Sequence, residues 1–142
     1  MPLDEQSKGE LSCELREQIL SQMPCGLCAA KRDEKKTLLF ANNSFYTMFG
    51  YESPAQAQDE GFLGAFDRTE PVYLPKIEEK LQCLLNGQET VLALEMQHRR
   101  RDNSVFWAMV RISGSEKDEG VWICAFMDIS AQKTVEAELR FR

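Results

Sequence analysis

Three apolar segments dominate the second half of the sequence, and short polar stretches separate them. They are VLALEMQH at 91–98, VFWAMVRI at 105–112 and VWICAFM at 121–127. In the first segment, apolar residues occupy alternate positions, which predicts a strand with one face on a core. Asp102 and Asn103 mark the tip of the first connection, and such residues favour tight turns. The three segments therefore predict three consecutive antiparallel strands.

Size and charge limit the kinds of protein that contain such a sheet. The chain has 142 residues, the size of one domain, and 43% of them are hydrophobic, which is typical of a globular protein. Its net charge of −6 argues against nucleic acid and anionic membranes as partners. The start of the chain lacks the features of a signal peptide, and no apolar run is long enough to span a bilayer. We therefore expect a cytoplasmic domain with no membrane segment of its own.

The first half of the chain predicts two further strands and several helices. Ser7 and Glu10 have the spacing of a capping box, and Leu11, Leu15 and Ile19 form a narrow apolar stripe behind them. The pattern predicts, in order, a helix at 8–22, strands within 26–30 and 37–41, a short helix at 43–49, an irregular segment at 52–70 and a helix at 75–86. The expected fold class is therefore α+β.

Three stretches in this order resemble motifs of the PAS domain family. FANNSFYTMFGYES at 40–53 resembles the family's strand followed by an aromatic-rich helix, and LEMQHRRRDNSVFW at 94–107 resembles its hairpin, with Asn103 in place of the usual glycine. FMDISAQKTVEAELR at 126–140 resembles its terminal Asp-Ile-Thr motif, with Ser130 in place of threonine. The resemblance implies a PAS fold, in which a five-stranded antiparallel sheet carries short helices on one face. The implied organisation is an N-terminal flanking and dimerisation helix at 1–22, a PAS domain at 23–129 and a C-terminal signalling helix at 130–142.

The same resemblance implies sensing instead of catalysis. In PAS domains, the concave face of the sheet and the long helix opposite it enclose a ligand pocket. His98, the single histidine, either orients a small ligand or is a hydrogen-bonded histidine at the rim, and we favour the second interpretation. Cys124 and His98 lack a third group to orient them as a catalytic pair, so we expect no enzymatic activity in this chain. The residues expected to line the pocket are Tyr73, Ile77, Met96, His98, Ala108, Val110, Cys124 and Phe126.

Three polar residues are expected to have structural roles. Asn42 precedes the aromatic-rich helix, Asp102 lies in the hairpin turn, and Asp128 stands where the last strand leaves the sheet. We expect Asp128 to pair with Arg99 or Arg101, near the hairpin. The basic run HRRR that contains both arginines is expected to be a solvated hairpin tip, because the protein as a whole is acidic.

No cofactor is expected from the sequence. The flavin-binding branch of the family has an Asn-Cys-Arg-Phe-Leu-Gln motif after the glycine that matches Gly64, and Asp67 stands here at the position of its cysteine. Haem-binding members often carry an axial histidine on the long helix, and the segment 75–86 contains none. We therefore expect a colourless protein without flavin, haem or metal, and we leave an unidentified small ligand open.

Five cysteines support a second hypothesis. Cys25 and Cys28 have CxxC spacing, which is typical of half a metal site or of a redox pair. A metal site needs about four ligands, and the sequence offers no second such pair. We favour small residues in a buried strand, and the alternative is a redox or metal-responsive switch that also uses Cys124.

The opposite face of the sheet is expected to be apolar and to need cover. The stripe of Leu11, Leu15 and Ile19 is the best candidate to cover it, and two such helices in a symmetric pair would cover it better than one. The expected assembly is therefore a homodimer that uses the N-terminal helix and Trp107. Period-two counting places on this face Trp107, Met109, Val121, Ile123 and Met127.

The C-terminal segment indicates how a signal would leave the domain. TVEAELRFR at 134–142 places Val135 and Leu139 four residues apart on one face of a helix. The segment resembles the junction that leads into a GGDEF diguanylate cyclase domain in bacterial signalling proteins, and histidine kinases use similar junctions. We therefore expect a downstream output domain in the same chain, either a diguanylate cyclase or, as the alternative, a histidine kinase.

Overall fold

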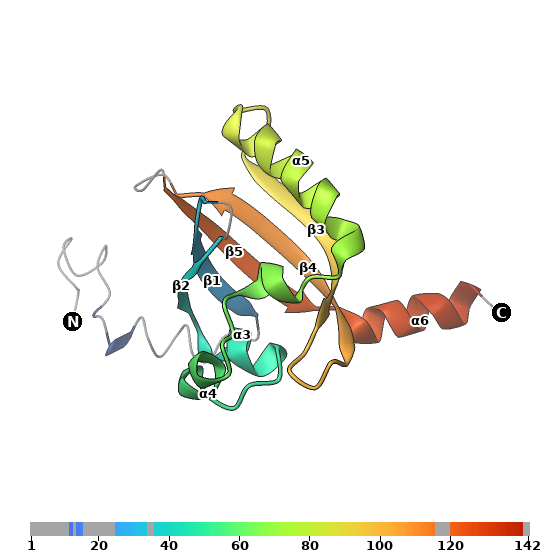
Figure 1. Cartoon of the computed structure of the whole chain (residues 1–142). Helices are drawn as coiled ribbons and strands as arrows, with labels where there is room; N and C mark the ends of the chain where they lie inside the picture. The colour runs from blue at the N-terminus through green and yellow to red at the C-terminus, as the bar shows by residue number, and fades with distance from the viewer. Residues whose placement is uncertain (1–11, 13, 16–24, 34–35, 116–119, 141–142) are drawn as a thin grey trace, which may run out of the picture.

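The computed structural model of the chain describes residues 12, 14–15, 25–33, 36–115 and 120–140. Five strands form one antiparallel sheet in the order β2-β1-β5-β4-β3, which confirms the predicted five-stranded α+β fold (Figure 1). The early strand β1 therefore lies beside the late strand β5, and the two ends of the domain meet within the sheet. The strands are β1 (Gly26–Lys31), β2 (Leu38–Ala41), β3 (Val91–Arg99), β4 (Val105–Gly114) and β5 (Val121–Asp128).

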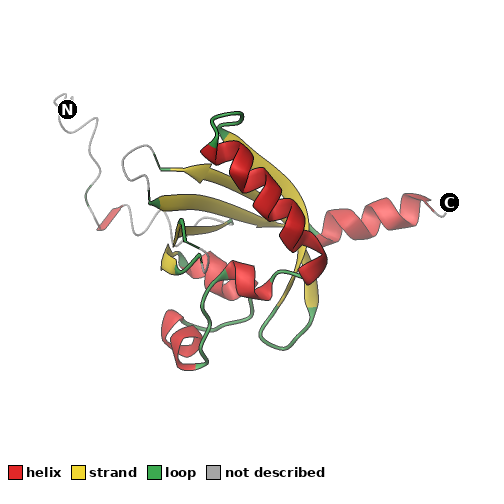
Figure 2. Cartoon of the chain, turned by 45° about the horizontal axis from the view of Figure 1, so that its top comes forward, coloured by secondary structure: helices red, strands yellow, loops and turns green. Residues whose placement is uncertain are grey.

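Helices connect β2 to β3 and continue the chain after β5 (Figure 2). The segment 52–70, expected to be irregular, instead contains α4 and η1, because Ser53 caps α4 with its hydroxyl and Pro54 occupies the first turn. No helix within the described ranges combines the length and the apolar composition that crossing a bilayer requires. The helices are α3 (Asn43–Met48), α4 (Pro54–Asp59), η1 (Ala65–Arg68), η2 (Pro71–Tyr73), α5 (Leu74–Leu85) and α6 (Ser130–Arg140).

The N-terminal helix predicted at 8–22 falls almost entirely outside the described residues. Leu11 and Ile19 are not described, and Leu15 is 43% exposed. The role of these three residues in dimerisation therefore stays a prediction.

One face of the sheet carries the core of the domain. From β4 and β5, every second side chain is buried on this inner face, in agreement with period-two counting. Helix α3 contributes Phe45 and Phe49 to the same core, and α5 contributes Ile77 and Leu81. The inner-face residues of the sheet are Cys28, Ala30, Leu92, Met96, His98, Phe106, Ala108, Val110, Ile112, Trp122, Cys124 and Phe126.

The opposite, outer face is partly apolar and partly exposed. Ile123 and Met127 on β5 are 49% and 53% exposed. A β-bulge between Ala29 and Ala30 disturbs the pairing of β1 with β2, and Leu39 and Phe40 on β2 are both about half exposed. Two consecutive apolar side chains are thus exposed at this edge, where the simple alternation of a strand would expose one of them.

A single buried amide joins β1 to the start of α3. The Asn42 side-chain oxygen accepts hydrogen bonds from the amide of Leu27 at 2.9 Å and from the amide of Phe45 at 3.0 Å. Its amide nitrogen donates to the carbonyl oxygen of Cys25 at 3.1 Å. Asn42 therefore caps α3 and at the same time fixes that helix against the strand, a structural role in line with the one the sequence suggested.

We expect Asn42→Ala to lower the free energy of unfolding by about 2–4 kcal/mol, because it removes a helix cap and leaves buried backbone groups without partners. Asn43→Ala is the matched control, since Asn43 is exposed at the first helical position. Urea unfolding monitored by circular dichroism measures both variants. Equal losses in the two variants would contradict the central role of Asn42.

Candidate functional site

His98 is the most unusual polar residue of the inner face. Its side chain is 1% exposed, on β3. Three phenyl rings surround the imidazole, with ring centroids 5.7 Å away for Phe49, 5.6 Å for Phe106 and 5.6 Å for Phe126. The histidine is hydrogen-bonded, as the interpretation favoured from the sequence has it, but it lies inside an aromatic cage and not at the rim of a pocket.

The hydrogen bonds around His98 determine which ring nitrogen carries the proton. The Thr69 hydroxyl donates to the Ala65 carbonyl at 3.0 Å, so its oxygen is left to accept from His98 Nδ1 at 3.1 Å. Nδ1 therefore carries the hydrogen, and Nε2 carries a lone pair. Among the described residues Nε2 has no hydrogen-bond partner, although it is fully buried. The site thus presents one unused hydrogen-bond acceptor within an apolar cage.

Burial keeps this imidazole neutral. Removal from water lowers the pKa of His98 to about 4, and the Ala65 carbonyl opposes the shift only in part. The ring is therefore uncharged at neutral pH. It can accept a hydrogen bond from a ligand or coordinate through Nε2, whereas it cannot act as a cation.

The structure brings most of the predicted pocket residues together, packed as a core. Ile77 of α5 lies with the β3, β4 and β5 residues in one buried cluster, and each of these side chains is 1% exposed or less. They are Met96, Ala108, Val110, Cys124 and Phe126, to which His98 adds its ring. Their shared burial agrees with the predicted inner face, and their binding of a ligand stays a prediction.

Tyr73 is partly buried and packs against the margin of that cluster. Its hydroxyl is 3.4 Å from the side-chain oxygen of Gln97, and its ring centroid is 6.3 Å from that of Trp107. Gln97 and Trp107 both alternate with inner-face residues, so they belong to the outer face. Tyr73 therefore contacts the core cluster at its margin and residues of the outer face as well.

A small cluster on the outer face anchors α6 to the sheet. The ammonium group of Lys133 pairs with the Glu95 carboxylate and lies 4.7 Å from the centroid of the Trp107 ring. The backbone amide of Trp107 donates to the Ser130 hydroxyl at 3.1 Å. We call Glu95, Trp107 and Lys133 the α6 anchor. Trp107, expected at a dimer interface, thus contacts a helix of its own chain.

The predicted partner of Asp128 is wrong by one position. Arg100 pairs with Asp128 at 3.2 Å, whereas Arg99 pairs with Glu70 at 2.8 Å and Arg101 with Glu60 at 2.7 Å. The basic run is therefore an exposed hairpin tip, as expected, whose three successive arginines pair with carboxylates of three different chain segments. The other oxygen of Asp128 accepts from the Ser130 amide at 2.9 Å, which starts α6.

The hairpin turn itself follows the sequence prediction. The Asp102 carboxylate accepts a hydrogen bond from the Ser104 amide at 2.9 Å, and bonding to Ser104 lowers the pKa of this exposed carboxyl. Asn103 adopts a left-handed conformation with φ of 67°, the one its glycine counterpart in the family would adopt freely.

Strand geometry separates the two cysteines of the CxxC motif. Three residues of extended chain span about 10 Å, and an odd spacing directs side chains to opposite faces of a sheet. Cys28 is buried on the inner face, and Cys25 is partly exposed just before β1. The described residues contain no group of three cysteine, histidine or acidic side chains arranged to hold a metal. The CxxC motif is therefore not a preformed pair.

An open hollow of about 280 Å³ lies between the turn after β1 and helix α5. Its two cations already have partners within the chain. Arg32 donates to the Val121 carbonyl at 3.2 Å and stacks over the Trp122 ring, and Lys36 pairs with Glu78 at 2.5 Å. These contacts tie the turn to the sheet and to α5, so they account for the charges without a ligand.

Comparison with known proteins identifies the family. The family model described as "PAS domain" matches residues 24–131, which include the whole sheet and the start of α6. The chain therefore belongs to the PAS domain family, whose members are sensory, non-catalytic domains. A search of curated proteins found no significant match.

Solved structures share the fold at low sequence identity. The PAS domain of a protein from Colwellia psychrerythraea is 15% identical with a TM-score of 0.65, over 83% of this chain and 97% of that one. A sensory box histidine kinase/response regulator from Burkholderia thailandensis E264 is 18% identical with a TM-score of 0.63, over 90% and 92%. An RNA-binding light-oxygen-voltage receptor is 15% identical with a TM-score of 0.64, over 99% of this chain and 42% of the receptor.

The depressed pKa of His98 predicts a loss of stability in acid. The unfolded chain binds a proton at His98 below a pH of about 6.5, and the folded chain does so only below about 4. Between these values the unfolded state holds more protons, so the free energy of unfolding falls as the pH falls, by up to about 3 kcal/mol.

We expect His98→Leu to flatten this part of the stability curve, because His98 is the single histidine of the chain. Urea unfolding of both proteins at a series of pH values between 7 and 4 measures the difference. Parallel curves for the wild type and the variant would show that His98 does not carry the effect.

Proposed function

We propose that this chain is a cytoplasmic sensory module that relays a small-molecule or partner signal through α6 to an output domain further along the chain. The α6 anchor carries this proposal. Trp107 of the anchor and Ala108 of the core are consecutive on β4 and point to opposite faces of the sheet. A change in the core that shifts β4 therefore moves the residue on which α6 rests.

The inner face supplies the sensing end of the proposal. The bare Nε2 of His98 favours a small ligand with a hydrogen-bond donor, because a donor would satisfy the buried acceptor. Such a ligand would have to displace side chains of the packed core, and that displacement is what β4 would transmit. We propose no flavin adduct, since Asp67 stands at the position of the reactive cysteine of flavin-binding members.

For the output domain, we retain the diguanylate cyclase as the first candidate, on the resemblance of the C-terminal junction. A histidine kinase is the second candidate, since one solved structure of the same fold is described as a sensory box histidine kinase/response regulator. Either output would follow α6, on which Val135 and Leu139 are 53% and 63% exposed. These two side chains form an apolar stripe that suits pairing with the same helix of a second copy.

We further propose a homodimer that uses the outer face of the sheet. Apolar side chains of β2 and β5 are about half exposed there, and a contiguous surface of this kind favours burial in an interface. A symmetric pair would hold two α6 helices at a fixed spacing, which is what an output domain could read.

The relay proposal predicts that α6 loosens when its anchor is broken. We expect Lys133→Met to accelerate amide exchange in α6 by about two- to fivefold, because the ion pair with Glu95 and the cation–π contact with Trp107 are both lost. Lys76→Met, which removes a charge from the exposed face of α5, is the control. Hydrogen exchange with mass spectrometry resolves the two helices. Unchanged exchange in α6 would exclude the anchor as the coupling element.

The dimer proposal predicts that a charge on the outer face dissociates the pair. Ile123→Glu places a carboxylate at the centre of the apolar surface, and Val72→Glu places one on η2, where the side chain is 76% exposed. We expect sedimentation velocity to show monomers for the first variant and dimers for the wild type and the second variant. A wild-type association state for Ile123→Glu would rule out this face as the interface.

A further inference from the structure

Two buried cysteines face each other across neighbouring strands. Cys28 of β1 and Cys124 of β5 are direct partners in the antiparallel register. Their exposed fractions are 5% and 0%, and both side chains lie on the inner face. The register and the shared face place the two thiols side by side. The redox alternative from the sequence includes Cys124 but does not pair it with Cys28, because 95 residues separate the two and their contact depends on the strand order.

The strand register and the shared face of Cys28 and Cys124 satisfy the geometric requirements of a disulfide. Directly opposed residues of antiparallel strands have Cα atoms about 4.5–5.5 Å apart, within the range of about 4.4–6.8 Å that disulfides require. Their Cβ atoms are about 4.5–5.5 Å apart, and a disulfide prefers about 3.5–4.5 Å. Bond formation thus needs β1 and β5 to approach by about 1 Å, and no rearrangement of the chain.

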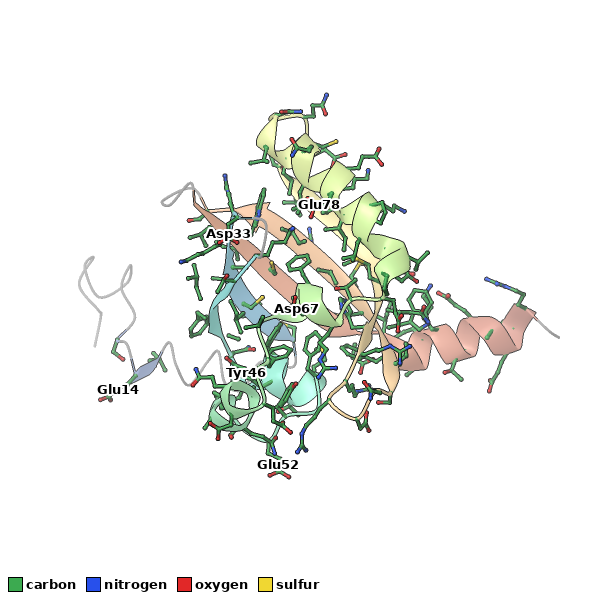
Figure 3. All side chains as sticks on the ribbon, in the orientation of Figure 1. Glu14, Asp33, Tyr46, Glu52, Asp67 and Glu78 are labelled. Atoms are coloured by element: carbon green, nitrogen blue, oxygen red, sulfur yellow. The ribbon has the colours of Figure 1, made fainter. Side chains whose placement is uncertain are left out.

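The surroundings of the pair protect it in its reduced form. The hydrogen bond with Cys124 and burial hold the pKa of the Cys28 thiol well above its ordinary value. Burial raises the pKa of the phenol of Tyr46 of α3, labelled in Figure 3, and the charge of a Cys28 thiolate would raise it further. Both groups are therefore neutral at neutral pH, and thiolate is scarce. Reaction requires local opening and is slow compared with that of an exposed cysteine.

We propose that Cys28 and Cys124 form a reversible cross-strand disulfide, which makes the sheet itself an oxidation-responsive site for hydroperoxides. This inference is independent of the proposed ligand and output domain. The redox hypothesis then applies to Cys28 and Cys124, which the fold brings together, and not to the two cysteines of the CxxC motif.

The chemistry balances with hydrogen peroxide as the oxidant. The Cys28 thiolate attacks one peroxide oxygen, the O–O bond breaks, and the departing hydroxide takes up a proton to become water. Cys28, the less deeply buried of the two, is now a sulfenic acid. The Cys124 sulfur then displaces the sulfenic oxygen, which leaves as a second water with the Cys124 proton. Two thiols are oxidised to one disulfide, and one peroxide is reduced to two waters.

The consequence of the bond follows from its place in the sheet. The Asn42 side chain joins β1 to the start of α3 by hydrogen bonds, and β5 leads directly into α6. A covalent link between β1 and β5 therefore couples α3, which packs on the core, to α6, which follows the sheet. We expect the disulfide to raise the free energy of unfolding of the sheet and to change the rate of amide hydrogen exchange at the start of α6.

The test uses the full chain with Cys13, Cys25 and Cys83 replaced by serine, so that Cys28 and Cys124 are its only thiols. The protein is reduced, treated with hydrogen peroxide and digested with trypsin without reductant. We expect a mass loss of two hydrogens and a cross-linked pair of peptides, 17–31 with 118–133, that disappears after treatment with dithiothreitol.

A matched control retains Cys25 and Cys124 and replaces Cys13, Cys28 and Cys83 by serine. It has the same number of thiols, and its retained cysteine lies three residues away on the same chain segment. We expect no cross-linked peptide from the control, because Cys25 does not face Cys124 in the register. A second control carries Cys28→Ala in place of Cys28→Ser, so that a folding defect caused by the buried serine is recognised. Circular dichroism checks that every variant is folded.

Two outcomes would overturn the proposal. The first is a two-cysteine protein that is folded and gives sulfinic acid or intermolecular dimers with no cross-linked peptide. The second is equal cross-linking in the matched control, which would mean that the disulfide forms in an unfolded chain. The rate supplies an independent check, since a raised thiol pKa requires it to increase about tenfold per pH unit and to keep increasing above a pH of about 9. A rate that levels off near a pH of about 8.5 would contradict the buried origin of the reaction.

Discussion

The side chain of Asn42 is the contact on which the arrangement of this domain depends. It satisfies backbone groups of Cys25 before β1, of Leu27 within β1 and of Phe45 within α3, and it does so where water is excluded. Because α3 carries Phe45 and Phe49, the direction of that short helix decides whether the aromatic core closes over the sheet. A six-residue helix has little stability of its own, so its position must come from such a contact.

The sheet separates two kinds of chemistry. Its inner face holds His98 and the opposed cysteines in an apolar environment, where burial keeps the imidazole and the Cys28 thiol uncharged at neutral pH. Its outer face holds the ion pair and the cation–π contact that position α6. Since residues of one strand alternate between the faces, the backbone of β4 is shared by both. The domain thus has a short physical path from its interior to the helix that leaves it.

Periodicity explains which parts of this structure could be predicted. The three late strands, the inner face and α5 follow from patterns that burial imposes on sequence, and the structure has them within a few residues. Helix α4 was missed although Ser53 and Pro54 signalled its start. The arginine pairs, the cage of His98 and the opposed thiols could not be predicted, because they depend on strand order and loop paths that bring distant residues together.

The bulge in the pairing of β1 with β2 limits aggregation of this domain through the edge of its sheet. An edge strand offers unpaired backbone groups to any other chain, and long flat edges seed fibrous aggregates. β2 is four residues long, and its pairing register shifts at the bulge. A second chain therefore finds too few aligned groups there to extend the sheet. Two copies of this domain can meet face to face through side chains, and open-ended growth along the hydrogen-bonding direction is blocked on this side.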